Sequence, residues 1–292
     1  MRYRYPVQVD KSEVIETIIA WFDRHERDLP WRSTTPWGVL VSEFMLQQTP
    51  VNRVLPKWYE WMSRWPTPGD LAASDISEAI RAWDRLGYPR RAQRLHQSAC
   101  AIVENHDGIV PSTYEDLIAL PGIGDYTASA VLCFAYKHSR PVLDTNVRRF
   151  YSRIELGTAY PPNSISKAEC ERAWEWTYES APQGARWAAA SMEFGQIICT
   201  AQRPQCSLCP ISSHCSWRLA NYPEAVISKR SQSWIGSDRQ CRGYLLNLLR
   251  EHDSLKVEIL LDSWHHRDQA ERCLNSLMAD KLVKSDGITA SL

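Results

Sequence analysis

Hydrophobic residues recur at three- and four-residue spacing along most of the first 200 positions, and alternating, strand-like stretches are few. This spacing is typical of an α-helix with one buried face, interrupted here by proline and glycine. Short helices joined by tight turns predict an all-α body. We expect the helices at residues 11–27, 36–48, 50–65, 74–84, 90–105, 113–119, 125–137, 145–155, 164–179 and 185–199.

The pattern changes in the last quarter of the chain. Residues 221–239 are polar with few apolar repeats, which predicts a linker. Residues 240–250 and 266–280 form amphipathic patterns again, and the Asp-Gly pair at 286–287 predicts a β-turn between two short strands. Helices followed by a terminal hairpin are the outline of a winged-helix-like module, and a packing appendage is the alternative.

The charges of the chain give no bulk attraction to nucleic acid, because 34 basic residues balance 34 acidic ones. Any DNA contact must therefore come from local patches. Two arginine-rich stretches, residues 85–96 and 146–153, are candidates, and each could instead be a solvated helix face. The chain has no apolar signal core at its N-terminus and no run near the roughly 18 apolar residues of a membrane span, so we expect a cytoplasmic protein.

Four of the nine cysteines lie within residues 199–215, separated by gaps of six, two and five residues. In a chain without a secretion signal, such a cluster indicates a metal site rather than disulfides. Zinc sites commonly use two close pairs of ligands, whereas an iron–sulfur cluster can take four cysteines from one short looping segment. The spacing favours iron–sulfur and leaves zinc open. The candidate ligands are Cys199, Cys206, Cys209 and Cys215.

Two carboxylates are candidates for catalysis. Glu43 lies in the apolar stretch "GVLVSEFML", where desolvation favours a neutral carboxyl of the kind that a general acid needs. The alternative is that Glu43 caps a helix or pairs with an arginine. Asp144 begins a predicted helix, where aspartate is ordinarily a cap, but a carboxylate in that place can also stabilise a developing positive charge.

The pentapeptide "LPGIG", residues 120–124, predicts a tight hairpin before a helix that begins near Asp125. The free N–H groups of such a helix start bind phosphate, so Gly122, Gly124 and Thr127 are candidates for contact with a DNA backbone. An ordinary corner between two helices is the alternative. Asp125 itself is unfavourable for a phosphate.

The cysteine spacing resembles the cluster loop of the endonuclease III and MutY group of DNA glycosylases. The hairpin sequence "LPGIGDYTASAVL" (120–132) and "VLDTNVRRF" (142–150) resemble that group's helix-hairpin-helix and aspartate motifs, and "LPWR" (29–32) with "SEFMLQQT" (42–49) resembles the MutY branch. Together these motifs cover about residues 20–220. The resemblance implies a two-lobed helix-hairpin-helix fold, with the substrate between the lobes. Its expected parts are a cluster lobe (1–28 and 138–220), a six-helix lobe (29–137), the linker (221–239) and the C-terminal module (240–292).

The resemblance implies a monofunctional, monomeric base excision repair enzyme of the bacterial cytoplasm or nucleoid, with a 4Fe–4S cluster on the four cysteines. It would hydrolyse the N-glycosidic bond of adenine opposite 8-oxoguanine or guanine in double-stranded DNA and leave an abasic site. Glu43 would protonate the departing adenine and then help to activate water, while Asp144 would stabilise an oxocarbenium-like sugar. Tyr126 stands where the endonuclease III branch has its lysine nucleophile, so no Schiff base is expected.

Further site residues follow from the same resemblance. Gln48 and Tyr88 match wedge positions that fill the gap left by an extruded base. The cluster loop would hold Arg203 against the DNA backbone. The remaining expected substrate-binding residues, each of which could instead be packing or a surface ion pair, are Arg27, Trp31, Arg32, Tyr126, Asn146 and Glu193.

The chain departs from the MutY pattern in several places. Thr145 replaces a glycine after the catalytic aspartate, Pro89 follows Tyr88 where a second tyrosine is common, and Asp125 replaces a basic residue. The segment after the linker is too short for the Nudix-like domain that MutY proteins usually carry. Two alternatives therefore stay open: a thymine or uracil mismatch glycosylase, and a non-catalytic, metal-stabilised DNA-binding protein.

Overall fold

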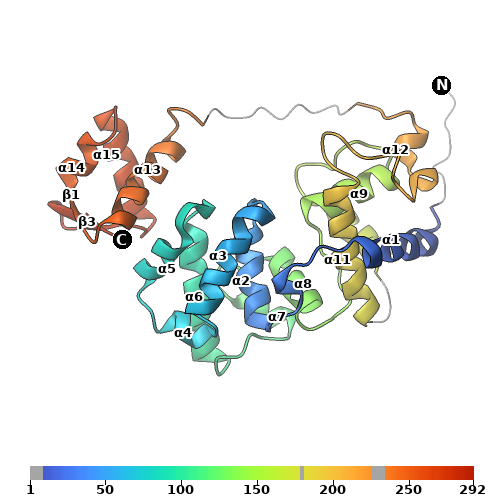
Figure 1. Ribbon diagram of the computed structural model, residues 1–292, viewed down its shortest axis with the longest axis horizontal. Helices are drawn as coiled ribbons and strands as arrows, with labels where there is room; N and C mark the ends of the chain where they lie inside the picture. The colour runs from blue at the N-terminus through green and yellow to red at the C-terminus, as the bar shows by residue number, and fades with distance from the viewer. Residues whose placement is uncertain (1–8, 178–180, 225–233) are drawn as a thin grey trace. The chain divides into compact units, whose positions relative to one another are not determined.

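The computed structural model describes residues 9–177, 181–224 and 234–292 (Figure 1). The chain forms two compact units. The first comprises residues 1–36, 112–114 and 124–229, and the second comprises residues 37–111, 115–123 and 230–292.

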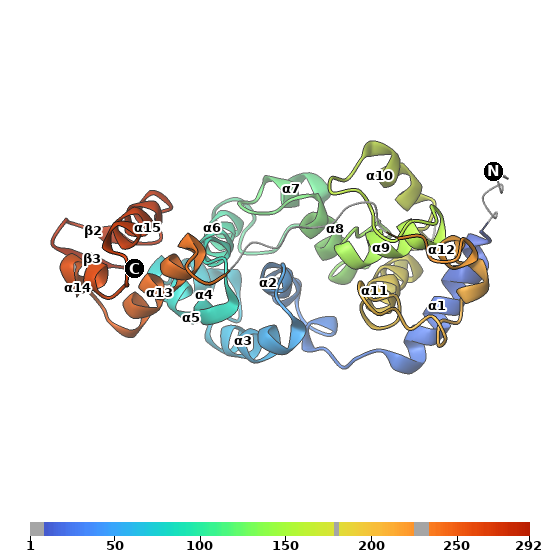
Figure 2. The same ribbon diagram turned by 90° about the horizontal axis from the view of Figure 1, so that it is seen from above.

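The first unit is built around helix α11. Its elements are α1 (Lys11–His25), η1 (Pro30–Arg32), α8 (Asp125–Phe134), α9 (Thr145–Ile154), α10 (Lys167–Trp174), α11 (Ala181–Ile197), η3 (Ser212–His214) and α12 (Ser216–Leu219). Helices α1 and α9 both pack on α11 (Figure 2). Phe150 of α9 lies at the centre of the core, with its ring edge-on to the rings of Trp176, Trp187 and Phe194. Edge-to-face aromatic contacts add to the stabilisation that burial provides.

Helix α8 belongs to the first unit because it packs on α11 through small residues. Ala130 and Cys133 share a buried cluster with Ala185 and Ala188. The expected six-helix lobe spans residues 29–137, whereas residues 29–36, 112–114 and 124–137 of that range belong to the first unit.

The second unit contains helix α2, on which Glu43 lies, and residues 120–123 of the hairpin. Its elements are α2 (Pro36–Leu46), α3 (Val51–Arg64), α4 (Pro68–Ala72), α5 (Ile76–Trp83), η2 (Asp84–Leu86), α6 (Arg90–Asn105) and α7 (Tyr114–Ala119). Every residue of α2 from Trp37 to Met45 is buried. The sequence of α2 is apolar on all sides, which is typical of a central helix surrounded by others.

The C-terminal module follows the order helix, strand, helix, helix, strand, strand. Its elements are α13 (Asp238–Glu251), β1 (Leu255–Lys256), α14 (Val257–Asp262), α15 (Arg267–Ala279), β2 (Lys284–Ser285) and β3 (Thr289–Ser291). The strands form an antiparallel sheet in the order β1-β3-β2. This is the winged-helix-like arrangement that the sequence predicted, and the Asp286-Gly287 turn joins β2 to β3 as expected.

The module also packs within the second unit. Ile80 of α5 belongs to the buried cluster of the module, and Arg81 donates hydrogen bonds to the carbonyls of Leu249 (2.9 Å) and Arg250 (2.8 Å). These carbonyls lie in the last turn of α13, where they have no partner within the helix, so a cation there stabilises the helix end.

The all-α body is confirmed, and a helix lies in each of the ten expected segments. The short helices α4, α12 and α14 were missed, because four to six residues show too little periodicity to identify. Residues 178–179 of the expected helix 164–179 and residues 225–233 of the expected linker lie outside the described residues. No described helix is long and apolar enough to cross a membrane.

Candidate active site and iron–sulfur centre

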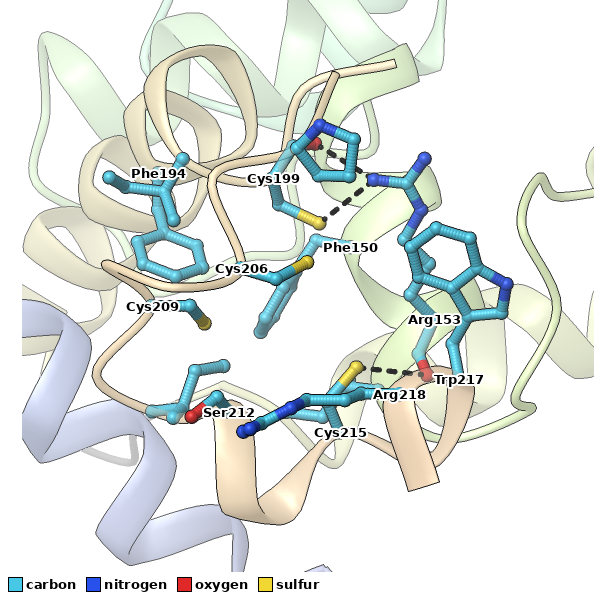
Figure 3. A pocket seen from close by; sticks show the side chains of 14 residues that line it. Phe150, Arg153, Phe194, Cys199, Cys206, Cys209, Ser212, Cys215, Trp217 and Arg218 are labelled. Carbon is cyan, nitrogen blue, oxygen red and sulfur yellow. Dashed lines mark hydrogen bonds between the residues drawn. The ribbon is translucent and has the colours of Figure 1, made fainter. Parts of the chain in front are cut away.

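The four clustered cysteines line one pocket in the first unit. Their sulfur atoms face a common pocket, and Phe150 and Phe194 form part of its apolar wall (Figure 3). Four cysteines from one looping segment that line one pocket fit the ligand set of an iron–sulfur cluster.

Burial disfavours ionisation of the thiols in this pocket. Burial raises the pKa of Cys209 to about 12 and also raises the pKa of Cys215. Both side chains are therefore neutral thiols at pH 7 in the protein alone. Conversion to thiolate ligands requires positive charge in the pocket, which iron ions supply.

Arg153 of α9 anchors the loop that carries the cysteines. Its guanidinium donates to the carbonyls of Thr200 (2.8 Å) and Ala201 (3.1 Å), and to the sulfur of Cys199 (3.4 Å). The guanidinium carbon also lies 4.4 Å from the centre of the Trp217 ring (Figure 3). The loop backbone is thus fixed by a buried arginine, which leaves the four sulfurs directed inward.

Asp144 caps helix α9. Its Oδ1 accepts hydrogen bonds from the backbone N–H groups of Asn146 (2.8 Å) and Val147 (2.7 Å), and its Oδ2 accepts one from the Asn146 amide (2.5 Å). Burial raises the pKa of Asp144, although these hydrogen bonds partly oppose the shift. The expected cap is therefore present, and it holds a buried carboxylate in one orientation.

Arg149 connects this cap to the cysteine loop. It donates to the carbonyls of Cys199 (2.8 Å) and Gly195 (2.5 Å), and to the side-chain oxygen of Asn146 (3.0 Å). The hydrogen bonds run from the cysteine loop through Arg149 and Asn146 to Asp144. Folding of the loop and orientation of the carboxylate consequently depend on the same arginine.

The arginines of α9 correct one expectation from the sequence. Residues 146–153 were a candidate surface patch, but Arg148, Arg149 and Arg153 are buried and bonded within the protein. Arg148, for example, forms a two-pronged ion pair with Glu169 (2.6 and 2.9 Å). Three arginines in ten residues predicted a charged face, because spacing alone cannot reveal that carbonyls and carboxylates surround them.

Arg27 and Arg32, two of the expected pocket residues, both contact a third, Glu193. This carboxylate, with its side chain 1 % exposed, accepts from the backbone N–H of Arg27 (2.8 Å) and forms ion pairs with Arg27 (3.4 Å) and Arg32. Trp31 lies between these two arginines in sequence and is buried. The sequence predicted this group from two segments more than 160 residues apart, and helix α11 brings them together.

Tyr126 and Thr127 lie in the first turn of α8, also in the first unit. Tyr126 is half-buried, whereas Thr127 is 3 % exposed and its side chain faces the interior. Asp125 accepts a hydrogen bond from the Tyr114 hydroxyl. A phosphate at this helix start would therefore meet backbone N–H groups rather than the Thr127 hydroxyl.

In the second unit, Glu43 is 5 % exposed and lies in the apolar helix α2, as expected. Gln48 follows α2 and Tyr88 precedes α6, and both adopt positive φ angles, 53° and 50°. Tyr88 is half-exposed, with 52 % of its surface accessible. Both expected wedge residues thus lie at tight backbone turns, in a conformation that few non-glycine residues adopt.

The hairpin needs glycine at only one of its two expected positions. Gly122 has φ +81°, and a Cβ there would lie 2.7 Å from Cβ of Arg94. Gly124 has an extended backbone with φ −112°, and a Cβ there would meet nothing within 4 Å. The turn and the close approach therefore occur at Gly122 alone.

Comparisons with known proteins agree with this geometry. Residues 41–176 match the HhH-GPD superfamily of base excision DNA repair proteins, and residues 199–215 match the iron-sulfur binding domain of endonuclease III. The adenine DNA glycosylase of Mycolicibacterium smegmatis is 46 % identical over 271 residues, which cover 91 % of each chain. The human adenine DNA glycosylase is 35 % identical over 77 % of this chain and 43 % of its own length. The chain belongs to the adenine DNA glycosylase family.

Solved structures support the fold of this glycosylase. A thermostable thymine-DNA glycosylase is 27 % identical, with a TM-score of 0.66 over 72 % of this chain and 97 % of that one. Endonuclease III in a non-covalent DNA complex is 21 % identical, with a TM-score of 0.63 over 73 % of this chain and 99 % of its own. The second similarity shows the fold alone. The glycosylase carries an iron–sulfur cluster on the cysteine loop, as the family match indicates.

The sequence predicted the carboxylates and the cysteines but missed the arginines that hold the cysteine loop, the Asp144 cap and the turns at Gln48 and Tyr88. Arg91, Arg149 and Arg153 have no recognisable motif of their own. No signal in the sequence singles them out, because their burial among polar partners depends on tertiary contacts.

Proposed function

We propose that this glycosylase is a monomer that hydrolyses the N-glycosidic bond of adenine paired with 8-oxoguanine or guanine in double-stranded DNA. The observation that carries this proposal is the match to adenine DNA glycosylases over 91 % of the chain. The buried, oriented carboxylate of Asp144 supports it, because cleavage of this bond needs a fixed negative charge beside the sugar.

In this proposal Asp144 stabilises the positive charge that develops on the deoxyribose. The carboxylate is already held by Val147 and Asn146, so it need not reorient when the bond breaks. Preorganised charge of this kind lowers the barrier without reorganisation during the reaction.

Glu43 supplies the proton in this proposal. Its position inside apolar helix α2 favours the neutral form, which can donate to the departing adenine. The resulting carboxylate then accepts a proton from the attacking water. Tyr126 offers no amine, so water is the nucleophile and the product is an abasic site without strand cleavage.

We further infer that the iron–sulfur centre is a 4Fe–4S cluster held by Cys199, Cys206, Cys209 and Cys215. Four thiols that face one pocket provide one ligand for each iron of such a cluster. When bound, the cluster fixes the loop and supplies the cations that buried thiolates require. Purified protein should contain about four irons and four inorganic sulfides per chain; stoichiometric zinc without visible absorbance would contradict the assignment.

The substrate is tested by single-turnover excision from three duplexes, with adenine opposite 8-oxoguanine, adenine opposite guanine, and thymine opposite guanine. We expect excision from the first two. Release of thymine but not adenine would support the mismatch alternative, which the similarity to a thymine-DNA glycosylase keeps relevant.

The catalytic roles are tested with Glu43→Gln and Asp144→Asn. Each variant keeps the shape of its side chain and removes its ionisable carboxyl. Removal of a group that stabilises transition-state charge costs about 10²–10³ in rate, and we expect losses of that size for each. Wild-type excision rates in both variants would refute the assignment. Binding without excision by the native protein would indicate a DNA-binding protein instead.

A further inference from the structure

The two expected wedge residues occupy strained backbone. Gln48 and Tyr88 have φ angles of 53° and 50°, in the left-handed region. A non-glycine residue in such a conformation costs about 1–3 kcal/mol and persists only where its surroundings hold it. The surroundings of both turns share one side chain.

That side chain is Arg91, in the first turn of α6. It is only 7 % exposed, and its guanidinium donates hydrogen bonds to both wedge turns. On the Gln48 side, Nη1 binds the carbonyls of Phe44 (3.0 Å), Met45 (3.2 Å) and Gln47 (2.5 Å), and Nη2 binds Oγ1 of Thr49 (3.1 Å). On the Tyr88 side, Nη2 binds the carbonyls of Leu86 (3.2 Å) and Gly87 (2.9 Å).

The arginine also contacts the Tyr88 ring itself. The guanidinium carbon lies 5.3 Å from the centre of that ring, and it lies at the same distance from the buried ring of Trp83. Thr49 completes the connection, because its hydroxyl donates to the carbonyl of Leu86 (3.2 Å). The backbone before Gln48, the Thr49 hydroxyl after it, the backbone before Tyr88 and the Tyr88 ring are therefore all bound to one rigid cation.

The chemistry of this position requires an arginine. Carbonyls at the C-terminal end of α2 have no partners within the helix and carry partial negative charge, so they favour a cation. A planar guanidinium directs its N–H groups along several fixed directions, whereas an ammonium is a point charge with three donors. Lysine could bind one turn, but it cannot span both with the same geometry.

We propose that Arg91 is a positioning residue that holds Gln48 and Tyr88 as one preorganised wedge for opening the DNA duplex. This inference rests on the proposed function, in which a base must leave the stack before it is cleaved. Base extrusion costs a few kcal/mol, and wedge side chains that are already ordered avoid an additional entropic cost when they enter DNA. Arg91 itself does not touch the reacting base.

The test compares Arg91→Met with the native protein on two substrates. The first is a fully paired duplex around an adenine opposite 8-oxoguanine. The second has the same target base within a short run of mismatches, where neighbouring pairs are already open. Loss of about 1–3 kcal/mol of preorganisation corresponds to roughly 5- to 150-fold in rate. We expect a loss of about tenfold or more from the paired duplex and a loss below about threefold from the open one.

Arg148→Met is the matched control. Arg148 is another buried arginine bonded to a carboxylate and to carbonyls, but it lies in α9 of the first unit, and its hydrogen bonds go to Glu169, Pro162 and Ser164 rather than to either wedge turn. Its loss should reduce stability and affect the two substrates equally. Rates are compared well below the unfolding temperature of each variant. If Arg91→Met does not fold, Arg91→Lys replaces it as the test variant. We expect the same result, a larger loss of rate on the paired duplex than on the open one.

Base extrusion is also measured directly, with 2-aminopurine at the target position, whose fluorescence rises when it leaves the stack. We expect a smaller rise with Arg91→Met at saturating protein. An equal loss on both substrates, or an unchanged fluorescence response, would overturn the inference. If the native protein excises nothing, the proposed function fails, but the fluorescence comparison still tests Arg91.

Discussion

The close approach of α11 to the start of α9 leads to a sharp prediction about Gly195. A Cβ added at Gly195 would lie 2.9 Å from both the Cβ and the carbonyl oxygen of Asn146, and 3.0 Å from the carbonyl carbon of that residue. Two of these three atoms belong to the backbone, so they cannot move away by a simple side-chain rotation. Gly195→Ala must therefore displace the first turn of α9, where Asp144 and Asn146 lie.

The expected size of the effect combines two opposing contributions. Overpacking of a filled site costs about 1–3 kcal/mol, and a clash with backbone belongs at the upper end of that range. Alanine within a helix is favoured over glycine by about 1 kcal/mol. The net destabilisation is then about 2 kcal/mol, which corresponds to a decrease of about 4–8 °C in the unfolding temperature of a unit of this size.

Thermal unfolding followed by circular dichroism measures this change, and single-turnover excision measures its consequence at Asp144. The matched control is Gly243→Ala in α13, because a Cβ there would meet nothing within 4 Å. That variant should gain up to about 1 kcal/mol from helix propensity and keep its activity. If Gly195→Ala unfolds at or above the native temperature, as the control should, the argument from the close contact is wrong.

Three further predictions follow from buried polar groups. Burial raises the pKa of Asp144, so its ionised form reduces stability above that pKa, and excision should be lost as pH falls through a value above the usual 3.9. For the same reason Asp144→Asn should unfold at a higher temperature than the native protein at pH 7, and this difference should shrink in acid. Excision that is lost only at pH 3.9 or below, or an unchanged unfolding temperature, would contradict this. Cys209→Ala should reduce the iron content per chain and the unfolding temperature, as measured by metal analysis and calorimetry, and full iron content would remove this residue from the ligand set. Arg148→Met should lower the free energy of unfolding by about 3–5 kcal/mol, because it leaves the Glu169 carboxylate buried without its partner. The double variant Arg148→Met/Glu169→Leu should recover most of that loss in urea unfolding, and equal losses in both variants would show that the ion pair is not the cause.

The helical segments could be predicted because each depends on local periodicity. The expected helix at 90–105 coincides with α6, and the cap at Asp144 was identified from its place at the start of a predicted helix. Helix ends were less accurate, as in the expected 125–137 that ends at Phe134, since the last turn depends on what packs against it. The position of Glu43 in a buried helix was likewise evident from its apolar neighbours.

The surroundings of the arginines could not be predicted from the sequence. Arg91 and Arg94 lie three residues apart in α6 with similar neighbours in sequence, yet Arg91 is buried among carbonyls and Arg94 is exposed. Which arginine enters the interior depends on where α2 ends in space. The same reason explains why residues 146–153 resembled a DNA-binding patch and became the internal bracing of the cysteine loop.

The sequence by itself therefore determined the elements, the carboxylates and the four thiols, because helix periodicity, apolar neighbours and cysteine spacing are local properties of the chain. The tertiary structure alone decided which partners hold these groups. Arg149 joins the cysteine loop to the Asp144 cap, and Arg91 joins the turns of Gln48 and Tyr88. These contacts link residues that are up to 50 positions apart in sequence. The sequence does not reveal them, because a backbone carbonyl needs a hydrogen-bond donor from the protein only when folding removes it from water.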